Sequence, residues 1–302
     1  MRRLSPLLIL ASLCLTGCDE ASTPAPDGGT PDGGGSGATE RTLDSCTATV
    51  ASDVPEFFKT YFQCADIRMD GTDVLLTTSD LPPYKTYYYG KGSPNFAEFD
   101  TSRGTQYHPN PNFLRAQQVT VRIPASPTER GLTITPSMVD GVAGGANDYP
   151  LGPAGIALNS VVLFNPLARP GDDIENEKYT FDDYNAHPQE MGMYHYHQYS
   201  KGPLQVLGKR GLVTNLEPGQ AELELYGIMC DGTLVMGCTE LSGAVPDKSG
   251  FDAQNGHVHD IASQAGTVFF THRYHVHICP TWTDKPRKFT PEIQYYTRCT
   301  PG

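Results

Sequence analysis

Histidine is the residue type in this sequence most able to do chemistry, and its distribution along the chain is uneven. Eight of the nine histidines lie between His187 and His277. Four of them form two tetrads, Tyr194-His195-Tyr196-His197 and Tyr274-His275-Val276-His277. On a β-strand this spacing puts both histidines of a tetrad on one face, with Cβ atoms about 6 to 7 Å apart, and the other two residues on the opposite face. Two imidazoles at this separation can converge on one metal ion.

A second histidine element precedes each tetrad. Phe181-Asp182-x-x-Asn185-x-His187 recurs as Phe251-Asp252-x-x-Asn255-x-His257, and Gly155–Ser160 can be aligned with Gly227–Gly232. The three matches keep the same order at offsets of 70 to 80 residues. This pattern predicts a duplication, with modules at about 155–200 and 227–280. The modules would form a pseudo-symmetric pair whose histidine-bearing strands could face each other.

Histidines at matching positions predict metal binding, in one shared site or in two separate sites. The predicted ligands are His187, His195, His197, His257, His275 and His277, with His259 and His272 as further candidates. Side chains near these ligands could support the site or orient the rings through the second ring nitrogen, namely Asp182, Asn185, Asp252, Asn255 and Asp260. Imidazole ligation without thiolate or thioether favours copper or zinc. Ring nitrogens that share an ion should approach one another to about 3 to 4 Å.

Three functions remain compatible with such a histidine-rich site. The first is capture or storage of a transition metal. The second is a metal-dependent enzyme, either hydrolytic with Asp252 or Asp260 as general base or a copper oxidoreductase with a nearby tyrosine. The third is a metal-free interaction module in which the histidines only pack and form hydrogen bonds. The sequence has no G-x-S-x-G, H-E-x-x-H or P-loop motif, assigns no catalytic residue and identifies no protein or small-molecule partner.

The elements that must position these histidines are mainly strands. With 31 glycines and 25 prolines the chain is unsuited to a helical bundle. Runs rich in β-branched or alternating residues predict strands at 74–78, 118–123, 132–135 and 221–226. The one short helix that the sequence favours covers Val54–Gln63. We therefore predict a mainly β fold, in which β-rich modules form a sandwich-like or barrel-like domain with long loops and few helices.

The beginning of the sequence predicts export and a lipid anchor. Arg2 and Arg3 precede a short apolar stretch typical of a signal peptide. The stretch ends in Leu15-Thr16-Gly17-Cys18, which resembles the lipobox of bacterial lipoproteins and implies cleavage after residue 17 and lipidation of Cys18. Residues 18–44 are rich in Pro, Gly and Asp and predict a disordered tether. The folded domain would then span 45–302 and be held at a membrane, facing the periplasm or the cell surface.

Charge and cysteine content bear on partners and compartment. The formal net charge is -12, from 22 basic and 34 acidic groups, and this excess of acid argues against nucleic-acid binding. The acidic segment 172–177 is expected to be a solvated loop.

Six cysteines remain beyond Cys18, and this even number predicts disulfides in an oxidising compartment. Cys46 is expected to pair with Cys64, whereas Cys230, Cys238, Cys279 and Cys299 allow three connectivities.

The same motifs resemble a known family. The two tetrads, the D-x-x-N-x-H elements and Gly155–Asn159 followed by Phe164-Asn165-Pro166 are similar to the bacterial YHYH-domain family, over about residues 65–280. The resemblance implies a secreted or lipid-anchored protein and no particular reaction. Val276 replaces the second tyrosine of the name motif in the second tetrad, whereas both histidines are kept.

Overall fold

The computed structural model describes residues 39–46, 48–139, 148–168, 172–297 and 299, and all of them fall in one compact unit. These residues form a mainly β structure with eleven strands in two sheets and three short α-helices. The two sheets are sandwich-like and neither closes into a barrel. Cys18 and the predicted signal peptide lie outside the described residues.

The smaller sheet comes from the first third of the chain. It consists of β1 (Asp66–Asp70), β2 (Asp73–Thr78) and β3 (Val119–Pro124), joined in antiparallel order. Alternate residues of β3 are buried, because successive side chains of a strand point to opposite faces. Helix α1 (Glu56–Tyr61) precedes the sheet and buries Phe57, Phe58 and Tyr61. The predicted helix and the strands predicted at 74–78 and 118–123 are present here.

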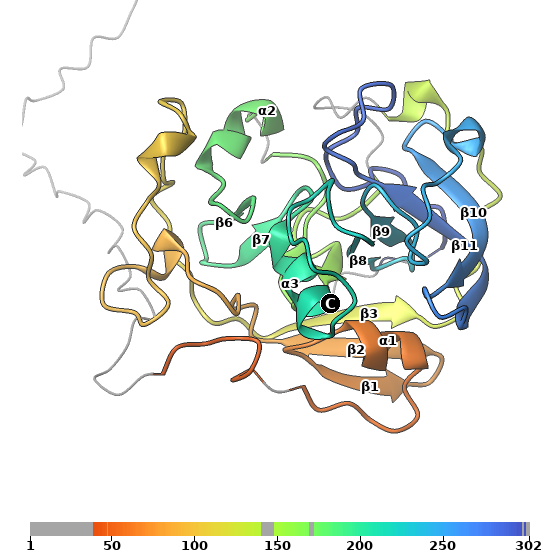
Figure 1. The fold of residues 1–302 in the computed structure, drawn as a ribbon, viewed down its shortest axis with the longest axis horizontal. Helices are drawn as coiled ribbons and strands as arrows, with labels where there is room; N and C mark the ends of the chain where they lie inside the picture. Colours follow the sequence, from red (N-terminus) through yellow and green to blue (C-terminus); the bar gives the residue numbers. More distant parts are fainter. Residues whose placement is uncertain (1–38, 47, 140–147, 169–171, 298, 300–302) are drawn as a thin grey trace, which may run out of the picture. The chain divides into compact units, whose positions relative to one another are not determined.

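The larger sheet has eight strands in the order β10-β11-β9-β8-β4-β5-β7-β6 (Figure 1). Its strands are β4 (Gly155–Ala157), β5 (Val162–Leu163), β6 (Ala186–Pro188), β7 (Tyr194–Tyr196), β8 (Leu225–Met229), β9 (Leu234–Met236), β10 (Gly256–Ala262) and β11 (Val268–His277). The strand expected at 221–226 begins only at Leu225, and residues 132–135 form no strand although Ile134 is buried. Ile134 is therefore buried although residues 132–135 form no hydrogen-bonded strand pair.

An approximate two-fold axis relates the two halves of the larger sheet. β4 and β8 pair antiparallel at its centre, and Ile156 pairs with Ile228, its counterpart in the sequence alignment of the two modules. The backbones are very close there, since a Cβ atom on Gly155 would lie 2.6 Å from the Ile228 carbonyl oxygen and one on Gly227 would lie 2.3 Å from that of Ile156. Only glycine fits at these two positions. Outward from the axis, the order β4-β5-β7-β6 mirrors β8-β9-β11-β10.

The histidine tetrads lie at opposite ends of this sheet rather than facing each other. β7 runs parallel to β5, and β11 runs parallel to β9, so each tetrad strand adds to the outer side of its own half. β6 and β10 then pair antiparallel with β7 and β11 and carry the other histidines. Figure 1 shows the β6–β7 and β10–β11 pairs on different sides of the molecule.

Two further helices stand between strands. α2 (Ile174–Glu177) begins after Asp173, whose side chain accepts a hydrogen bond from the backbone of Glu175. α3 (Lys201–Lys209) follows the first tetrad and is capped by Ser200. Within the part of the chain that the structure describes, no helix has the length and apolar character needed to cross a membrane.

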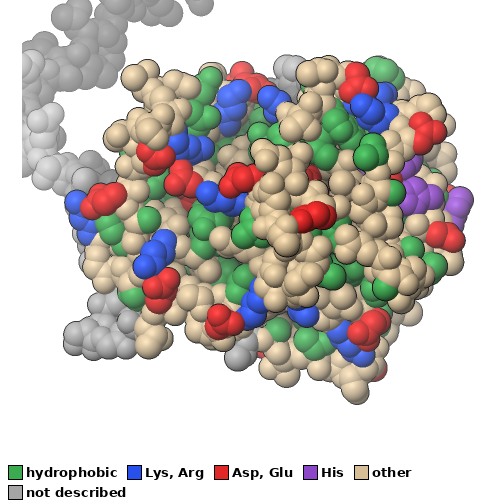
Figure 2. All heavy atoms as spheres, viewed as in Figure 1, with side chains coloured by type: hydrophobic (Ala, Val, Ile, Leu, Met, Phe, Trp, Pro, Cys, Tyr) green, Lys and Arg blue, Asp and Glu red, His purple; other side chains and the backbone are tan. Residues whose placement is uncertain are grey.

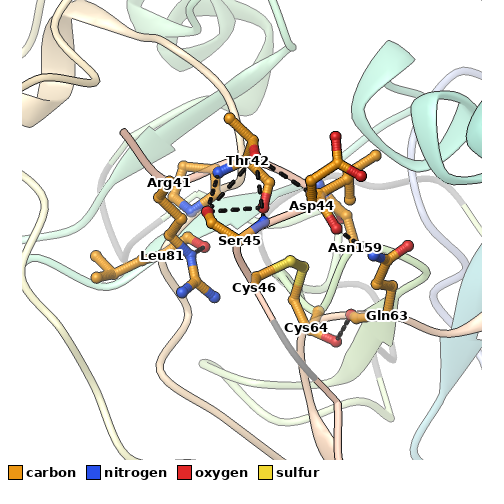
Figure 3. The surroundings of a disulfide bond; sticks show 12 residues. Arg41, Thr42, Asp44, Ser45, Cys46, Gln63, Cys64, Leu81 and Asn159 are labelled. Atoms are coloured by element: carbon orange, nitrogen blue, oxygen red, sulfur yellow. Dashed lines mark hydrogen bonds between the residues drawn. A yellow bond between two sulfur atoms is a disulfide. The ribbon is translucent and has the colours of Figure 1, made fainter. Parts of the chain in front are cut away.

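Disulfides join segments that are distant in the sequence. Cys46 is joined to Cys64, as the sequence predicts, and the other pairs are Cys230–Cys299 and Cys238–Cys279. Around the first pair the backbone N–H of Thr42 donates to Ser45 Oγ at 2.7 Å, and Arg41 Nε donates to the Leu81 carbonyl at 2.9 Å (Figure 3). The three disulfides fit an exported protein, because such bonds persist in oxidising compartments.

Candidate metal centres

The first group of converging histidines is the triad His187, His195 and His197, on and beside β6 and β7. His187 and His195 are cross-strand neighbours in the β6–β7 pair. His195 Nε2 lies 3.0 Å from His187 Nε2 and 3.0 Å from His197 Nε2. All three residues are about 2% exposed. Two of the three nitrogen separations therefore meet the predicted distance of about 3 to 4 Å, and all three donor atoms lie within 4.8 Å of one another in a closed interior.

The hydrogen bonds of the triad assign the protonated nitrogen of each ring. His195 Nδ1 lies 3.1 Å from the Met193 carbonyl, and His197 Nδ1 lies 2.6 Å from the Asn165 carbonyl. A carbonyl oxygen can only accept, so both Nδ1 atoms carry the proton. Thr180 Oγ1 donates to the Glu177 carbonyl and thus accepts from His187 Nδ1 at 2.7 Å.

Three Nε2 lone pairs consequently point at one another. Neutral imidazoles in this tautomer have no proton to share at Nε2, so their lone pairs repel at 3.0 Å unless a cation lies between them. A Zn²⁺ or copper ion about 2 Å from each nitrogen would remove this repulsion. The triad therefore has the donor atoms and the orientation of a three-histidine metal site.

Aromatic rings and burial keep the triad uncharged. Phe164 stacks on His195 with ring centroids 3.7 Å apart, and Phe181 stacks on His197 at 5.7 Å. Burial lowers the pKa of His197 to about 4. Burial, and then the neighbouring histidines, lower the pKa of His187 and of His195 well below the usual value. Neutral rings are the form that binds metal.

One carboxylate approaches the triad from the acidic segment. Glu177 Oε1 lies 3.7 Å from His187 Nε2, and the Glu177 side chain is 25% exposed. The segment 172–177 is thus not wholly a solvated loop, since its last residue turns toward the histidines. Glu177 does not belong to the group of converging donor atoms formed by the triad.

The second group is the His–Glu cluster, made of Glu240, His257, His259, His275 and His277. The Glu240 carboxylate lies at its centre. Glu240 Oε1 is 3.1 Å from His257 Nε2 and 3.4 Å from His277 Nε2. Glu240 Oε2 is 3.0 Å from His259 Nε2 and 3.1 Å from His275 Nε2. Donor atoms of Glu240, His257, His259 and His275 all lie within 4.8 Å of one another, as a shared ion requires.

The Nδ1 atoms of this cluster repeat the pattern of the triad. His275 Nδ1 lies 3.1 Å from the Arg273 carbonyl, His277 Nδ1 lies 2.7 Å from that of Gly237, and His259 Nδ1 lies 2.6 Å from that of Asp260. These rings hold the proton at Nδ1 and direct Nε2 toward Glu240. Rings in this form cannot donate from Nε2, and neither Glu240 oxygen has a hydrogen-bond partner among the described residues. Burial by itself raises the pKa of Glu240, but the four surrounding histidines outweigh it and leave the pKa lowered. The carboxylate is therefore ionised.

The turn residues that recur in the two halves have a structural role in positioning the rings. Asp182 Oδ1 accepts hydrogen bonds from the backbone N–H groups of Tyr184 and Ala186, and its Oδ2 accepts from the Tyr194 hydroxyl. Asp252 makes the equivalent contacts to Gln254, Gly256 and Tyr274.

 The carboxylates therefore shape the turns that lead into β6 and β10, whereas backbone carbonyls and the Thr180 hydroxyl orient the rings.

Asn185 and Asn255 also belong to these turns. Both have a φ of 59°, a left-handed conformation that asparagine tolerates better than most residues. Asn185 Nδ2 donates to the Tyr199 carbonyl, and Asn255 Nδ2 donates to the Lys285 carbonyl. The hydrogen bonds of both side chains go to backbone carbonyls, so the two asparagines position β6 and β10 through the backbone.

The remaining candidates divide between the His–Glu cluster and the surface. His259 is part of the cluster, with its Nε2 atom 3.0 Å from Glu240 Oε2, and its pKa is raised chiefly by the neighbouring Glu240 carboxylate. His272 is 77% exposed and lies 3.6 Å from Glu129, outside both groups. Asp260 contributes its carbonyl to His259, while its carboxylate accepts from the backbone N–H of His272. Asp252 and Asp260 are thus occupied by backbone groups, which does not favour either as a general base.

Sequence reasoning missed Glu240. It lies in the loop after β9, outside both histidine motifs, and the residue 72 positions earlier in the first half is Ala168. No spacing rule connects it with His257 or His275. The Cys238–Cys279 disulfide holds this loop against the end of β11 and brings the carboxylate to the rings.

The fold and the two histidine groups define a mainly β protein with two candidate metal centres. Residues 122–245 match the family model described as YHYH protein. The resemblance seen in the sequence is confirmed for this segment, which contains the triad and Glu240 and ends before β10. No curated protein and no solved structure matches the chain.

Proposed function

We propose that this protein binds copper or zinc at two centres, the triad and the His–Glu cluster, and that it does so at the cell envelope. One observation carries the proposal. In all three rings of the triad, and in His259, His275 and His277 of the cluster, the Nδ1 proton is engaged by a carbonyl or hydroxyl oxygen, and the Nε2 lone pairs converge without a proton between them. A cation resolves this repulsion in both groups.

The donor set supports copper or zinc over other metals. Every cysteine in the described residues is in a disulfide, so thiolate ligation is excluded there. The donors are imidazoles, with one carboxylate in the second group, and this chemistry suits Zn²⁺ or copper better than Ca²⁺ or Mg²⁺. The role that follows is capture or storage of the metal.

The location in the proposal rests on two features. The disulfides fit an oxidising compartment. The Leu15-Thr16-Gly17-Cys18 segment and the polar tether after it support a lipid anchor on Cys18, which would hold the centres close to a membrane.

Metal analysis of the full chain, purified without a histidine tag, tests the proposal. We expect two ions per chain after incubation with copper or zinc and removal of excess metal. His195→Ala should lose the ion of the triad, and His275→Ala should lose the ion of the His–Glu cluster. His272→Ala is the control, because His272 is 77% exposed and belongs to neither group.

Competition between the two metals then identifies the preferred one, from the ratio bound when both are supplied at equal concentration. A protein that takes up neither metal, or that keeps both ions in the His195→Ala/His275→Ala double variant, would contradict the proposal. The first result would leave the metal-free interaction module as the function.

A further inference from the structure

The two candidate centres differ in their access to solvent. All three histidines of the triad are buried, and two of their rings are covered by Phe164 and Phe181. In the His–Glu cluster, by contrast, the side chains of His257 and His259 are 14% and 37% exposed, while those of His275 and His277 are fully buried. One edge of the cluster is thus open and the other is closed.

A surface groove of about 440 Å³ leads to the open edge. Glu240, His257 and His259 form part of its wall, and the rest comes from Val258 and from the segments 245–247 and 249–250. Because a water molecule occupies about 30 Å³ in the liquid, the groove can admit a hydrated ion or a small chelator. Figure 2 shows histidine side chains at the surface where Figure 1 draws β10 and β11.

The charge of the groove favours cations. Glu240 and Asp247 line it, and no lysine or arginine does. Asp247 is exposed, and its pKa is lowered by hydrogen bonds from Ser249, so it is ionised at neutral pH. A negative entrance raises the local concentration of metal ions.

We infer that the His–Glu cluster is an exchange centre that loads and releases its metal through this groove, whereas the triad retains its ion. The inference rests on the proposed function. Exchange is ligand substitution: an incoming donor forms a bond to the ion as the bond to His259 Nε2 breaks, and no electron is transferred. His259 is the departing ligand because its side chain is the most exposed of the five.

The single tryptophan of the chain allows the two centres to be followed separately. Trp282 lies beside the cluster, with its ring centroid 5.7 Å from that of His277 and 5.8 Å from that of Phe251. Cu²⁺ bound at the cluster should quench its fluorescence. The triad lies at the other end of the sheet, so copper there should affect the signal far less.

The experiment measures copper release from the loaded full chain to a chelator in excess. Absorbance of the chelator complex reports total release, and recovery of Trp282 fluorescence reports release from the cluster. We expect two phases, with fluorescence recovering in the fast phase only. His195→Ala should keep only the fast phase, and His275→Ala only the slow one.

A groove variant tests the route with a matched control. Val245 lines the groove and is 78% exposed, whereas Val268 is 51% exposed and lies at the start of β11 outside the groove. Val245→Phe should slow the fast phase severalfold, and Val268→Phe should leave it unchanged. Neither substitution removes a ligand or adds a tryptophan.

The outcomes separate the two proposals. If no copper is bound, the proposed function fails. If two ions are bound but leave at the same rate, or if the slow phase carries the fluorescence change, the exchange centre is disproved. An equal effect of Val245→Phe and Val268→Phe would show that the groove is not the route.

Discussion

At the scale of single residues, the two centres differ most in their carboxylates. Glu240 lies within 3.4 Å of four Nε2 atoms. Glu177 approaches a single Nε2 atom, at 3.7 Å. A divalent ion in the His–Glu cluster thus has a negative ligand in direct reach, whereas an ion in the triad is held by neutral donors. Because burying charge without compensation is costly, the carboxylate should contribute strongly to affinity.

Glu240→Gln tests this contribution. The amide keeps the size of the side chain and can donate hydrogen bonds to Nε2 atoms, but it removes the negative charge. We expect metal affinity of the cluster to fall by at least about tenfold, with the triad unaffected and the metal-free protein no less stable. Calorimetric titration measures both affinities. Glu98→Gln, at a side chain 78% exposed, is the control, and equal affinities in both variants would contradict the prediction.

At the scale of elements, short strands and tight turns set the ring positions. The turns at Asp182 and Asp252 start β6 and β10, and cross-strand pairing places His187 opposite His195 and His257 opposite His275. The Cys238–Cys279 disulfide supports the second centre from both sides. Cys238 precedes Glu240 by two residues, and Cys279 follows His277 by two residues.

Replacing this disulfide should damage one centre only. In a Cys238→Ser/Cys279→Ser variant the Glu240 loop loses its link to β11, so we expect weaker metal binding at the cluster and unchanged binding at the triad. The Cys46→Ser/Cys64→Ser variant is the control. It should cost a comparable free energy of unfolding, about 2 to 4 kcal/mol, without changing metal affinity. Denaturant titration and calorimetry measure the two quantities, and equal loss at both centres would refute the prediction.

Sequence periodicity predicted the pairing of histidines within each tetrad, because alternation on a strand places His195 with His197 and His275 with His277 whatever the rest of the fold. It did not predict β6 and β10, which carry the other histidines of the two groups. The sequence could not predict that the tetrads lie at opposite ends of one sheet, since this depends on parallel pairing with β5 and β9. It also could not identify Glu240, whose position depends on a disulfide between distant residues. Residue spacing within a segment predicts the geometry of that segment, but it does not predict which distant strands pair or which distant cysteines form a disulfide.

At the scale of the whole molecule, buried neutral histidines make stability depend on pH. Burial lowers the pKa of His197 to about 4 in the folded protein, below its ordinary value of 6.5. The unfolded chain therefore takes up protons first as pH falls. The stability that the neutral ring contributes is complete above pH 6.5 and is lost as pH falls toward 4.

The metal-free protein should accordingly unfold more readily in mild acid. For His197 alone the loss between pH 6.5 and 4 is about 3 kcal/mol, and the other two triad histidines act in the same direction. Urea denaturation at a series of pH values measures it. A His197→Gln variant should show a shallower pH dependence, and constant stability of the unmodified protein over this range would disprove the prediction.

Attachment to the membrane is a second property of the whole molecule. If Cys18 is lipidated, Cys18→Ser should abolish labelling by a radioactive fatty acid and shift the protein from the membrane fraction to the soluble fraction. Cys14→Ser is the matched control, because Cys14 lies within the apolar stretch and should leave labelling intact. Loss of label in both variants, or in neither, would contradict lipidation at Cys18.

The two halves related by the axis between β4 and β8 can acquire different substitutions, which the two subunits of a symmetric homodimer cannot. In a homodimer every substitution occurs twice, so both copies of a site change together. Here the related halves are one polypeptide, and Glu240 and Trp282 stand beside the second centre alone. One half can therefore specialise in exchange while the other keeps a tightly enclosed ion, and each can be altered without disturbing its counterpart.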